Sequence, residues 1–172
     1  MTVHIATNGH LSLWCMQRTL VLIKPDGLQR RLAGEIITRL ERKGLSLVGI
    51  KMLQMDDQAI ADHYKHLSTR PFFPEIAAFM KSAPIIATCW AGVEAIATVR
   101  ILCGATNGRT AIPGTIRGDL AMSVQANVVH ASETPEAAEE EIRRFFAPTE
   151  LFEYPDKGLT LIYSPSEGSG RT

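Results

Sequence analysis

Hydrophobic residues along the chain follow two different periods. Four short stretches, 18–23, 45–55, 85–92 and 127–130, are rich in apolar and β-branched residues and predict strands. Between them, apolar residues recur at helical spacing over 32–43, 93–103 and 134–146, which predicts amphipathic helices. The run 20–23 is apolar at every position, as is typical of a central strand buried on both faces.

Residues with special backbone preferences mark where these elements begin and end. The sequence KPDG at 24–27 predicts a turn after the first strand, because proline fixes φ and the Asp-Gly pair tolerates a reversal. A proline-bounded turn and a short helix are expected over 69–84. The other boundaries are Gly44 and Gly104 at helix C-termini, and Asp56 or Asp57 and Thr134 with Pro135 at helix N-termini.

The order of these elements predicts one layered domain of α/β or α+β class. Strands and helices alternate, so that helices cover a four-stranded sheet, although periodicity does not separate parallel from antiparallel pairing. At 172 residues the chain has room for one domain with a hydrophobic core, which we place at 18–164. Residues 1–17 show no sustained periodicity and are expected to form a loosely ordered arm, and the polar tail 165–172 is expected to be disordered.

Composition argues against several classes of function. Eighteen Lys and Arg balance eighteen Asp and Glu, so no net field attracts the protein to nucleic acid or to a membrane surface. No stretch has the length of apolar sequence that crosses a bilayer, and the first residues do not resemble a signal peptide. The three cysteines form no CxxC pair, which suits buried thiols in a reducing compartment. We therefore expect a cytoplasmic protein with no membrane and no specific nucleic acid as partner.

Any anionic ligand has to be bound locally by cationic side chains. Neither GxxxxGK[ST] nor GxGxxG occurs, so the glycine-rich loops that cradle phosphates are missing. The glycine-punctuated segment 104–119 is long for a loop, and long loops are usually functional. Each cation is by itself more typical of a solvated surface charge, so only their convergence would indicate a site. The candidates at or beside predicted loops are Lys24, Arg70, Arg100, Arg109 and Arg117.

His130, in the sequence NVVHAS, is the best candidate for a nucleophile. No serine lies in GxSxG and no local Cys–His signature is present, so an acyl-transfer triad has little support. An imidazole can attack phosphorus at neutral pH, small neighbours leave space for phosphoryl oxygens, and Ser132 offers a hydrogen bond. A histidine beside valines is, however, more often a structural core residue. The carboxylates that can orient it are Asp119, Glu139 and Glu141, and helix periodicity does not choose between the last two.

Two other groups admit both a functional and a structural interpretation. His63 and His66 lie three residues apart on a predicted helix, a spacing that can hold a metal, but no third ligand accompanies them and ordinary helix surface is the simpler interpretation. Phe72 and Phe73 are most simply core residues or a loop anchor, although an exposed Phe beside Arg70 can stack on a nucleobase.

Five motifs in a fixed order, KPDG, RPFFPE, GATN, PGTIRGD and NVVHAS, resemble those of nucleoside diphosphate kinases. The resemblance covers residues 18–154. It implies a ferredoxin-like βαββαβ core of α+β class, whose four-stranded antiparallel sheet is covered by helices lying largely on one face. It also implies a ping-pong reaction, in which a nucleoside triphosphate phosphorylates His130 and a nucleoside diphosphate then takes the phosphoryl group.

The resemblance implies a role for individual residues of this sequence. Glu141 matches the carboxylate that orients His130, with Ser132 beside it, while Lys24 and Asn127 match residues that contact the ribose hydroxyls. Tyr64 is expected to steady the phosphates near the nucleophile. The expected phosphate ligands are Arg70, Arg100, Thr106 and Arg117, and the expected slot for the base is formed by Phe72 and Val124.

The resemblance also implies a cofactor and partners. Mg²⁺ is expected, bound through the nucleotide phosphates and not by a protein metal site. The expected substrates are nucleoside tri- and diphosphates such as ATP, GTP and GDP, with broad specificity for the base. Family members are usually hexamers or tetramers, so a homo-oligomer is expected.

This sequence departs from the family pattern at two places. Ala131 stands where a glycine usually follows the histidine, and its Cβ narrows the range of φ beside the nucleophile. Gly108 and Arg109 stand where a proline usually follows TN, which is expected to loosen the long loop. The alternative to an enzyme is a nucleotide-binding module that keeps the fold without turnover. The sequence favours the enzyme, because every polar position assigned above carries the family's residue.

Overall fold

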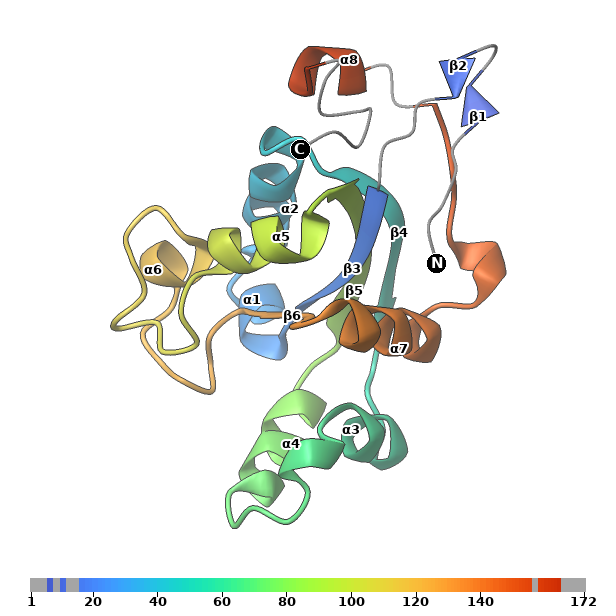
Figure 1. The fold of residues 1–172 in the computed structure, drawn as a ribbon. Helices are drawn as coiled ribbons and strands as arrows, with labels where there is room; N and C mark the ends of the chain where they lie inside the picture. The colour runs from blue at the N-terminus through green and yellow to red at the C-terminus, as the bar shows by residue number, and fades with distance from the viewer. Residues whose placement is uncertain (1–5, 8–9, 12–15, 156–157, 165–172) are drawn as a thin grey trace.

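The computed structural model describes residues 6–7, 10–11, 16–155 and 158–164 (Figure 1). The predicted tail 165–172 and most of the expected N-terminal arm lie outside the described residues. In chain order the elements are β1 Ala6–Thr7, β2 His10–Leu11, β3 Met16–Ile23, α1 Pro25–Gln29, α2 Ala33–Arg42, β4 Ser46–Leu53, α3 Asp57–His63, the 3₁₀ helix η1 Lys65–Leu67, α4 Phe73–Lys81, β5 Ile85–Val93, α5 Ala95–Cys103, α6 Ile116–Leu120, β6 Val129–Ala131, α7 Pro135–Phe145, the 3₁₀ helix η2 Pro148–Glu150 and α8 Leu159–Ile162.

A four-stranded sheet with the order β4-β5-β3-β6 forms the centre of the molecule (Figure 1). Every neighbouring pair is antiparallel, which settles the question that periodicity left open. Strand β3 pairs with β5 along its whole length and with β6 over its last three residues, where His130 stands opposite Leu22. The prediction of an α+β, ferredoxin-like βαββαβ core is confirmed.

Helices cover both faces of the sheet, so the expectation that they lie largely on one face is wrong. Val21 and Ile23 of β3 belong to one core, which α2 and α5 cover. Leu20 and Leu22 point to the opposite face and belong to a second core, which α3, α4 and α7 cover. The physical reason is the uninterrupted apolar run 20–23, because a strand buried on both faces needs a helical layer on each side.

Several predicted boundaries differ from the structure, and β6 begins only at Val129 although a strand is predicted over 127–130. Residues of KPDG form the short helix α1 instead of a turn, since Pro25 at its first position already has a helical φ. Strand β3 begins at Met16, inside the expected arm, because residues 16–17 already pair with β5. The long glycine-punctuated segment contains helix α6, which Thr115 caps by accepting a hydrogen bond from Gly118 N–H at 3.0 Å.

The predicted caps place the helices that carry the site. Asp56 accepts a hydrogen bond from Ala59 N–H at 2.8 Å and begins α3, and Thr134 accepts one from Ala137 N–H at 3.2 Å and begins α7. Gly104 ends α5 with a φ of 75°, in the left-handed region that favours glycine. No described helix is long and apolar enough to span a lipid bilayer.

Neither departure from the family pattern distorts the chain. Ala131 lies in β6, is 8% exposed and does not have a positive φ, so its Cβ imposes no backbone strain. Gly108 does not leave a loose loop: its N–H donates to Ser123 O at 3.2 Å, and a Cβ built on it would lie 2.5 Å from Ala121 O. Close backbone contact therefore pins this loop.

Gly108→Ala is expected to lower the free energy of unfolding by about 1–3 kcal/mol, because the added methyl group overlaps the Ala121 backbone. The control is Gly34→Ala in α2, where no atom lies within 4 Å of the added Cβ and the better helix propensity of alanine is expected to add up to about 1 kcal/mol. Urea denaturation of both variants measures the difference. Equal destabilisation by the two substitutions would contradict the close packing at Gly108.

Candidate functional site

A cavity of about 1040 Å³ opens where the end of β3, the region from α3 to α4, the loop before and after α6, β6 and α7 meet. It gathers most of the predicted site residues from distant parts of the chain. Those that line it are Lys24, Tyr64, Phe72, Arg100, Thr106, Arg117, Val124, Asn127, His130 and Glu141.

Other candidates, Glu139 included, lie outside the lining of this cavity. Arg70 is exposed in the turn before α4, and Arg109 is exposed and donates to Met122 O at 3.4 Å. Asp119 is bound to Arg39 at 2.6 Å and to Gly114 N–H at 2.7 Å, so it does not orient His130. Ser132 is fully buried and reaches the cavity only through Glu141.

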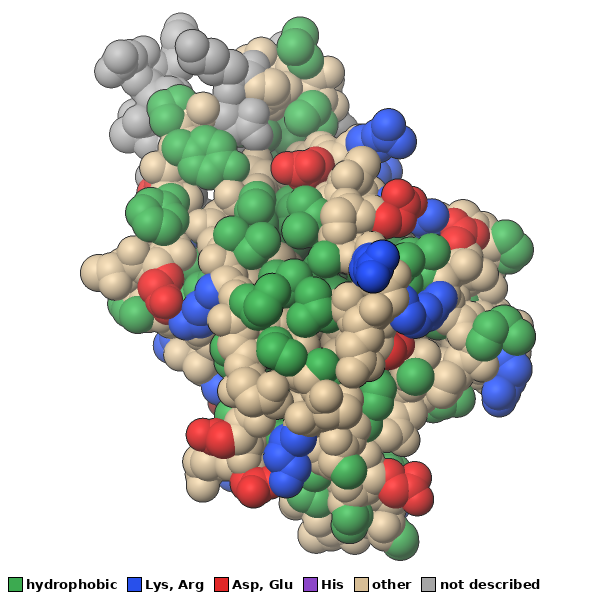
Figure 2. Space-filling model, turned by 180° about the vertical axis from the view of Figure 1, so that it is seen from behind, with side chains coloured by type: hydrophobic (Ala, Val, Ile, Leu, Met, Phe, Trp, Pro, Cys, Tyr) green, Lys and Arg blue, Asp and Glu red, His purple; other side chains and the backbone are tan. Residues whose placement is uncertain are grey.

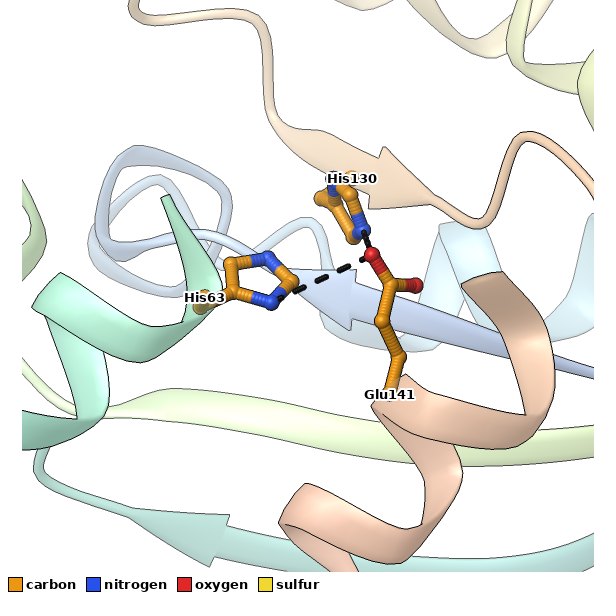
Figure 3. A group of neighbouring side chains, drawn as sticks. All are labelled: His63, His130 and Glu141. Atoms are coloured by element: carbon orange, nitrogen blue, oxygen red, sulfur yellow. Dashed lines mark hydrogen bonds and ion pairs between the residues drawn. The ribbon is translucent and has the colours of Figure 1, made fainter. Parts of the chain in front are cut away.

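His130 projects from β6 toward Glu141 of α7 (Figure 3). Its side chain is 22% exposed, which excludes the interpretation of a sealed core histidine. The Nε2 atom lies 2.9 Å from Glu141 Oε1. An ionised carboxylate only accepts hydrogen bonds, so this contact places a proton on Nε2, and in the neutral ring Nδ1 then carries the lone pair.

Glu141 is fixed by a second hydrogen bond, which Ser132 Oγ donates to its Oε2 at 2.6 Å. Ser132 Oγ in turn accepts from Leu20 N–H of β3 at 3.2 Å. Burial raises the pKa of Glu141, but the hydrogen bonds and charges of its neighbours, His130 foremost, outweigh it and leave that pKa below its ordinary value. The carboxylate is therefore ionised and held by the central strand.

His63 also belongs to this group, contrary to the interpretation of it as helix surface. Its ring packs edge-to-face against His130 with centroids 4.4 Å apart, and it is 5% exposed (Figure 3). Burial lowers the pKa of His63 to about 3, and the neighbouring His130 acts in the same direction, so the His63 ring is neutral. Arg144 donates to its Nδ1 at 3.4 Å. Its Nε2 is buried with no hydrogen-bond partner among the described residues.

Lys24 lies at the end of β3 and is only 8% exposed. Its Nζ donates to Asn127 Oδ1 at 2.8 Å and to the backbone oxygen of Gln125. Burial lowers the pKa of Lys24 to about 8, while the charge of Asp26 acts in the opposite direction. Lys24 therefore loses its proton more easily than an exposed lysine. It contacts the side-chain amide of Asn127, the other residue that the family resemblance assigns to the ribose hydroxyls.

Two guanidinium groups approach the cavity from α5 and α6. Arg117 donates to Gly104 O and to Val129 O, both at 2.8 Å, so it is fixed beside the strand that carries His130. Burial lowers the pKa of Arg117, although it remains far above neutrality. Arg100 is half exposed and pairs with Glu133 at 3.5 Å, an interaction that solvent screens.

Two hydrophobic side chains remain open to solvent at the mouth of the cavity. Phe72 is 47% exposed and Val124 is 52% exposed, while Phe73 packs against the second core. The structure therefore separates the two phenylalanines, which the sequence did not distinguish. A phenyl ring and an aliphatic side chain in this position can hold a flat ring by stacking.

Among the described residues, His63, His130 and Glu141 are the group with the spacing of metal ligands. One ligand atom from each lies within 4.8 Å of the others (Figure 3). Two imidazoles and one carboxylate suit zinc, whereas magnesium prefers a shell of oxygen ligands. This group does not fit magnesium.

A family model, curated relatives and solved structures all match this chain to one family. The family model described as nucleoside diphosphate kinase matches residues 17–151. The nucleoside diphosphate kinase of Parabacteroides distasonis is 53% identical over 152 residues, which cover 88% of this chain and 99% of that protein. Nucleoside diphosphate kinase B of Bos taurus is 44% identical over 147 residues, which cover 86% and 97%.

A solved structure agrees over the same length. The halophilic nucleoside diphosphate kinase from Halobacterium salinarum, in complex with CDP, superposes with a TM-score of 0.84 at 41% identity and covers 86% of this chain and 99% of that one. With this identity across nearly the full length of each relative, the chain belongs to the nucleoside diphosphate kinase family of enzymes that act on nucleotides.

Proposed function

We propose that the enzyme transfers the γ-phosphoryl group of a nucleoside triphosphate to a nucleoside diphosphate by a ping-pong mechanism through Nδ1 of His130. The observation that carries this proposal is the 2.9 Å contact between His130 Nε2 and Glu141 Oε1. It occupies one ring nitrogen as a donor and leaves the other as a nucleophile, at a cavity wall that cationic side chains share.

The two half-reactions use the same atoms in opposite directions. The Nδ1 lone pair forms a bond to the γ-phosphorus, the bond from phosphorus to the bridging oxygen breaks, and the nucleoside diphosphate leaves with that electron pair. A terminal oxygen of a second diphosphate then attacks the phosphorus, and the N–P electron pair returns to Nδ1. The ring gains positive charge while it carries the phosphoryl group, and Glu141 stabilises that charge.

Cationic side chains lower the cost of bringing phosphate oxygens together. Phosphoryl transfer passes through a loose transition state that needs positioning and charge neutralisation more than covalent assistance. We assign this task to Arg117, which its two backbone contacts preorganise, and to Arg100, which exchanges the screened contact with Glu133 for a phosphate. Thr106 and Tyr64 line the same cavity and contribute hydroxyl groups. Arg70 is exposed two residues before Phe72, which lines the cavity, and we assign it a further contact with the phosphates.

Magnesium enters this proposal as part of the substrate. The nucleotide brings Mg²⁺ on its β- and γ-phosphates, where the ion neutralises charge and aligns the oxygens. The residues at the cavity then need to supply only side chains that hold the phosphates, the ribose and the base.

Nucleoside recognition is assigned to the other end of the cavity. Lys24 and Asn127 form one hydrogen-bonded unit suited to ribose hydroxyls, and Phe72 and Val124 offer surfaces to both faces of a base. Stacking discriminates poorly among bases, so we expect broad specificity. The solved relative from Halobacterium salinarum holds CDP, and CDP is therefore a suitable probe ligand.

We further propose that the enzyme is a cytoplasmic homo-oligomer, a hexamer or a tetramer. Figure 2 shows hydrophobic side chains gathered across the middle of one face, with charges of both signs around them. Strand β4 lies at one edge of the sheet, where Phe152 N–H donates to Val48 O at 2.9 Å, and it exposes Ile50 and Met52 by 50% and 60%. An apolar edge strand favours association with another chain. Cys89 and Cys103 are free, buried thiols, in keeping with a reducing compartment.

The alternative is a nucleotide-binding module that keeps the fold without turnover, and a phosphoenzyme assay separates the two. Incubation with γ-labelled ATP and Mg²⁺ is expected to give an acid-labile, alkali-stable phosphoprotein that discharges onto GDP. His130→Ala is expected to abolish the label because the nucleophile is gone. The control His66→Ala, at an exposed histidine, is expected to keep it. A wild-type protein that binds CDP but takes no label would leave only the module.

Arg117→Ala is expected to lower kcat/KM by about ten- to a thousandfold, because it removes a preorganised donor from the phosphates in the transition state. A coupled assay of steady-state turnover measures the effect. Arg143→Ala removes an exposed arginine of α7 that pairs with Glu139, and is expected to leave kcat/KM unchanged. If the two variants behave alike, Arg117 has no role at the phosphates.

The affinity for CDP is expected to fall as the pH rises through about 8, where Lys24 loses its proton. Calorimetric titration across this range measures Kd, and Lys24→Met is expected to bind weakly with little dependence on pH. The free energy of unfolding changes in the opposite direction as the pH rises. Unfolded Lys24 keeps its proton up to about 10.5, so this group makes the free energy of unfolding rise between the two pKa values. A wild-type Kd that does not change with pH would contradict this role of Lys24.

A further inference from the structure

Val128 has a backbone conformation that β-branched residues rarely adopt. Its φ is 62°, and it is fully buried, whereas the other described non-glycine residues with positive φ, Arg31 and Glu94, are exposed at helix ends. Val129 N–H donates to Asn127 O at 2.8 Å and closes a three-residue turn around Val128. A turn of this kind with a positive central φ is rare and strained.

The segment that follows β3 holds this turn from both sides. Val128 N–H donates to Asp26 Oδ2 at 3.1 Å, and Val128 O accepts from Lys24 N–H at 2.9 Å. Gly27 lies so close that a Cβ on it would stand 2.9 Å from Val128 O. Both hydrogen-bonding groups of the strained residue are thus bound by α1 and the residue before it.

The strained turn lies between two residues assigned to the reaction. Asn127 precedes it, and its side chain is fixed by Lys24 Nζ, Thr106 O and Val124 O at 2.8 Å each. His130 follows two residues later in β6. If Val128 relaxed to an extended conformation, the peptide between residues 127 and 128 would rotate. The Asn127 amide and the His130 ring would then lose their relative placement.

Asp26 is an unusual choice for a purely structural contact. Its Oδ1 is buried with no hydrogen-bond partner among the described residues. Its Oδ2 accepts the hydrogen bond from Val128 N–H. Burying an unpaired polar atom is unfavourable, and such groups persist mostly where they have a function.

We propose that Asp26 is a positioning residue, whose carboxylate holds the strained turn at Val128 and thereby sets the geometry between Asn127 and His130. Asp26 does not contact the reacting atoms in this account, because it acts through the backbone of Val128. The effect of Asp26 on turnover rests on the proposed function. The effect of Asp26 on the position of Asn127 can be measured by ligand binding alone.

Substitutions at residues 26 and 128 test the proposal through their coupling. Asp26→Ala removes the acceptor and is expected to lower kcat/KM by about ten- to a hundredfold. Asp26→Asn keeps an acceptor without the charge and is expected to lie much closer to the wild type. Val128→Gly makes a positive φ easy to adopt, so Asp26→Ala is expected to cost far less activity in the Val128→Gly background.

Two controls separate this effect from general damage. Val128→Ala shortens the side chain like Val128→Gly but keeps a Cβ, so it is not expected to suppress the effect of Asp26→Ala to the same degree. Glu150→Ala removes another carboxylate that accepts a backbone N–H, from Ala147 at 2.8 Å, outside the cavity lining. It is expected to lower stability without changing kcat/KM.

The outcomes are distinct. Equal loss of activity by Asp26→Ala and Asp26→Asn would show that the charge of Asp26 matters and its acceptor does not, and would overturn the proposal. Additive effects of the substitutions at 26 and 128 would also overturn it. If the wild type shows no turnover, the proposed function fails, and the same variants are compared by their Kd for CDP. A coupled loss of CDP affinity then still supports the positioning role, and unchanged affinity overturns it.

Discussion

The hydrogen bond between Glu141 and Nε2 of His130 is the interaction on which the site depends. An imidazole has two similar nitrogens, and only a fixed partner on one of them makes the other a defined nucleophile. Here the partner comes from α7 and the proposed nucleophile from β6, and Ser132 anchors the carboxylate to the backbone of β3. The central strand of the sheet therefore controls the orientation of the ring that faces the cavity.

The fold explains how a few hydrogen bonds are sufficient to fix the side chains of the site. Strand β3 is buried on both faces and pairs on both edges, so its backbone is held on every side near the site. Lys24 lies at its end, and Leu20 lies behind Ser132. Charged groups are costly inside a protein, and the site keeps Lys24, Arg117 and Glu141 partly buried because each has fixed partners. The cations Lys24 and Arg117 are therefore already positioned for an anionic ligand.

The sequence predicted the sheet and its helices, and most of the site residues it named line the cavity, although not every contact was predicted. Periodicity could not choose between Glu139 and Glu141, because both flank the apolar stripe of α7 and only the packing of α7 on β3 decides. The spacing of three between Ile60 and His63 places both on one helix face, so the sequence contains a signal for the burial of His63 that its interpretation as helix surface does not use. The positive φ of Val128 had no signal in the sequence, since contacts with Asp26 and Lys24 impose it.

In the proposed mechanism, His130 carries the phosphoryl group on Nδ1 because Glu141 holds Nε2. Heteronuclear NMR of the protein labelled with ¹⁵N at histidine, recorded before and after phosphorylation by a nucleoside triphosphate, identifies the nitrogen bonded to phosphorus. We expect coupling of phosphorus to Nδ1 of His130, with Nε2 still protonated. Phosphorus bonded to Nε2 of His130, or to any other residue, would contradict it.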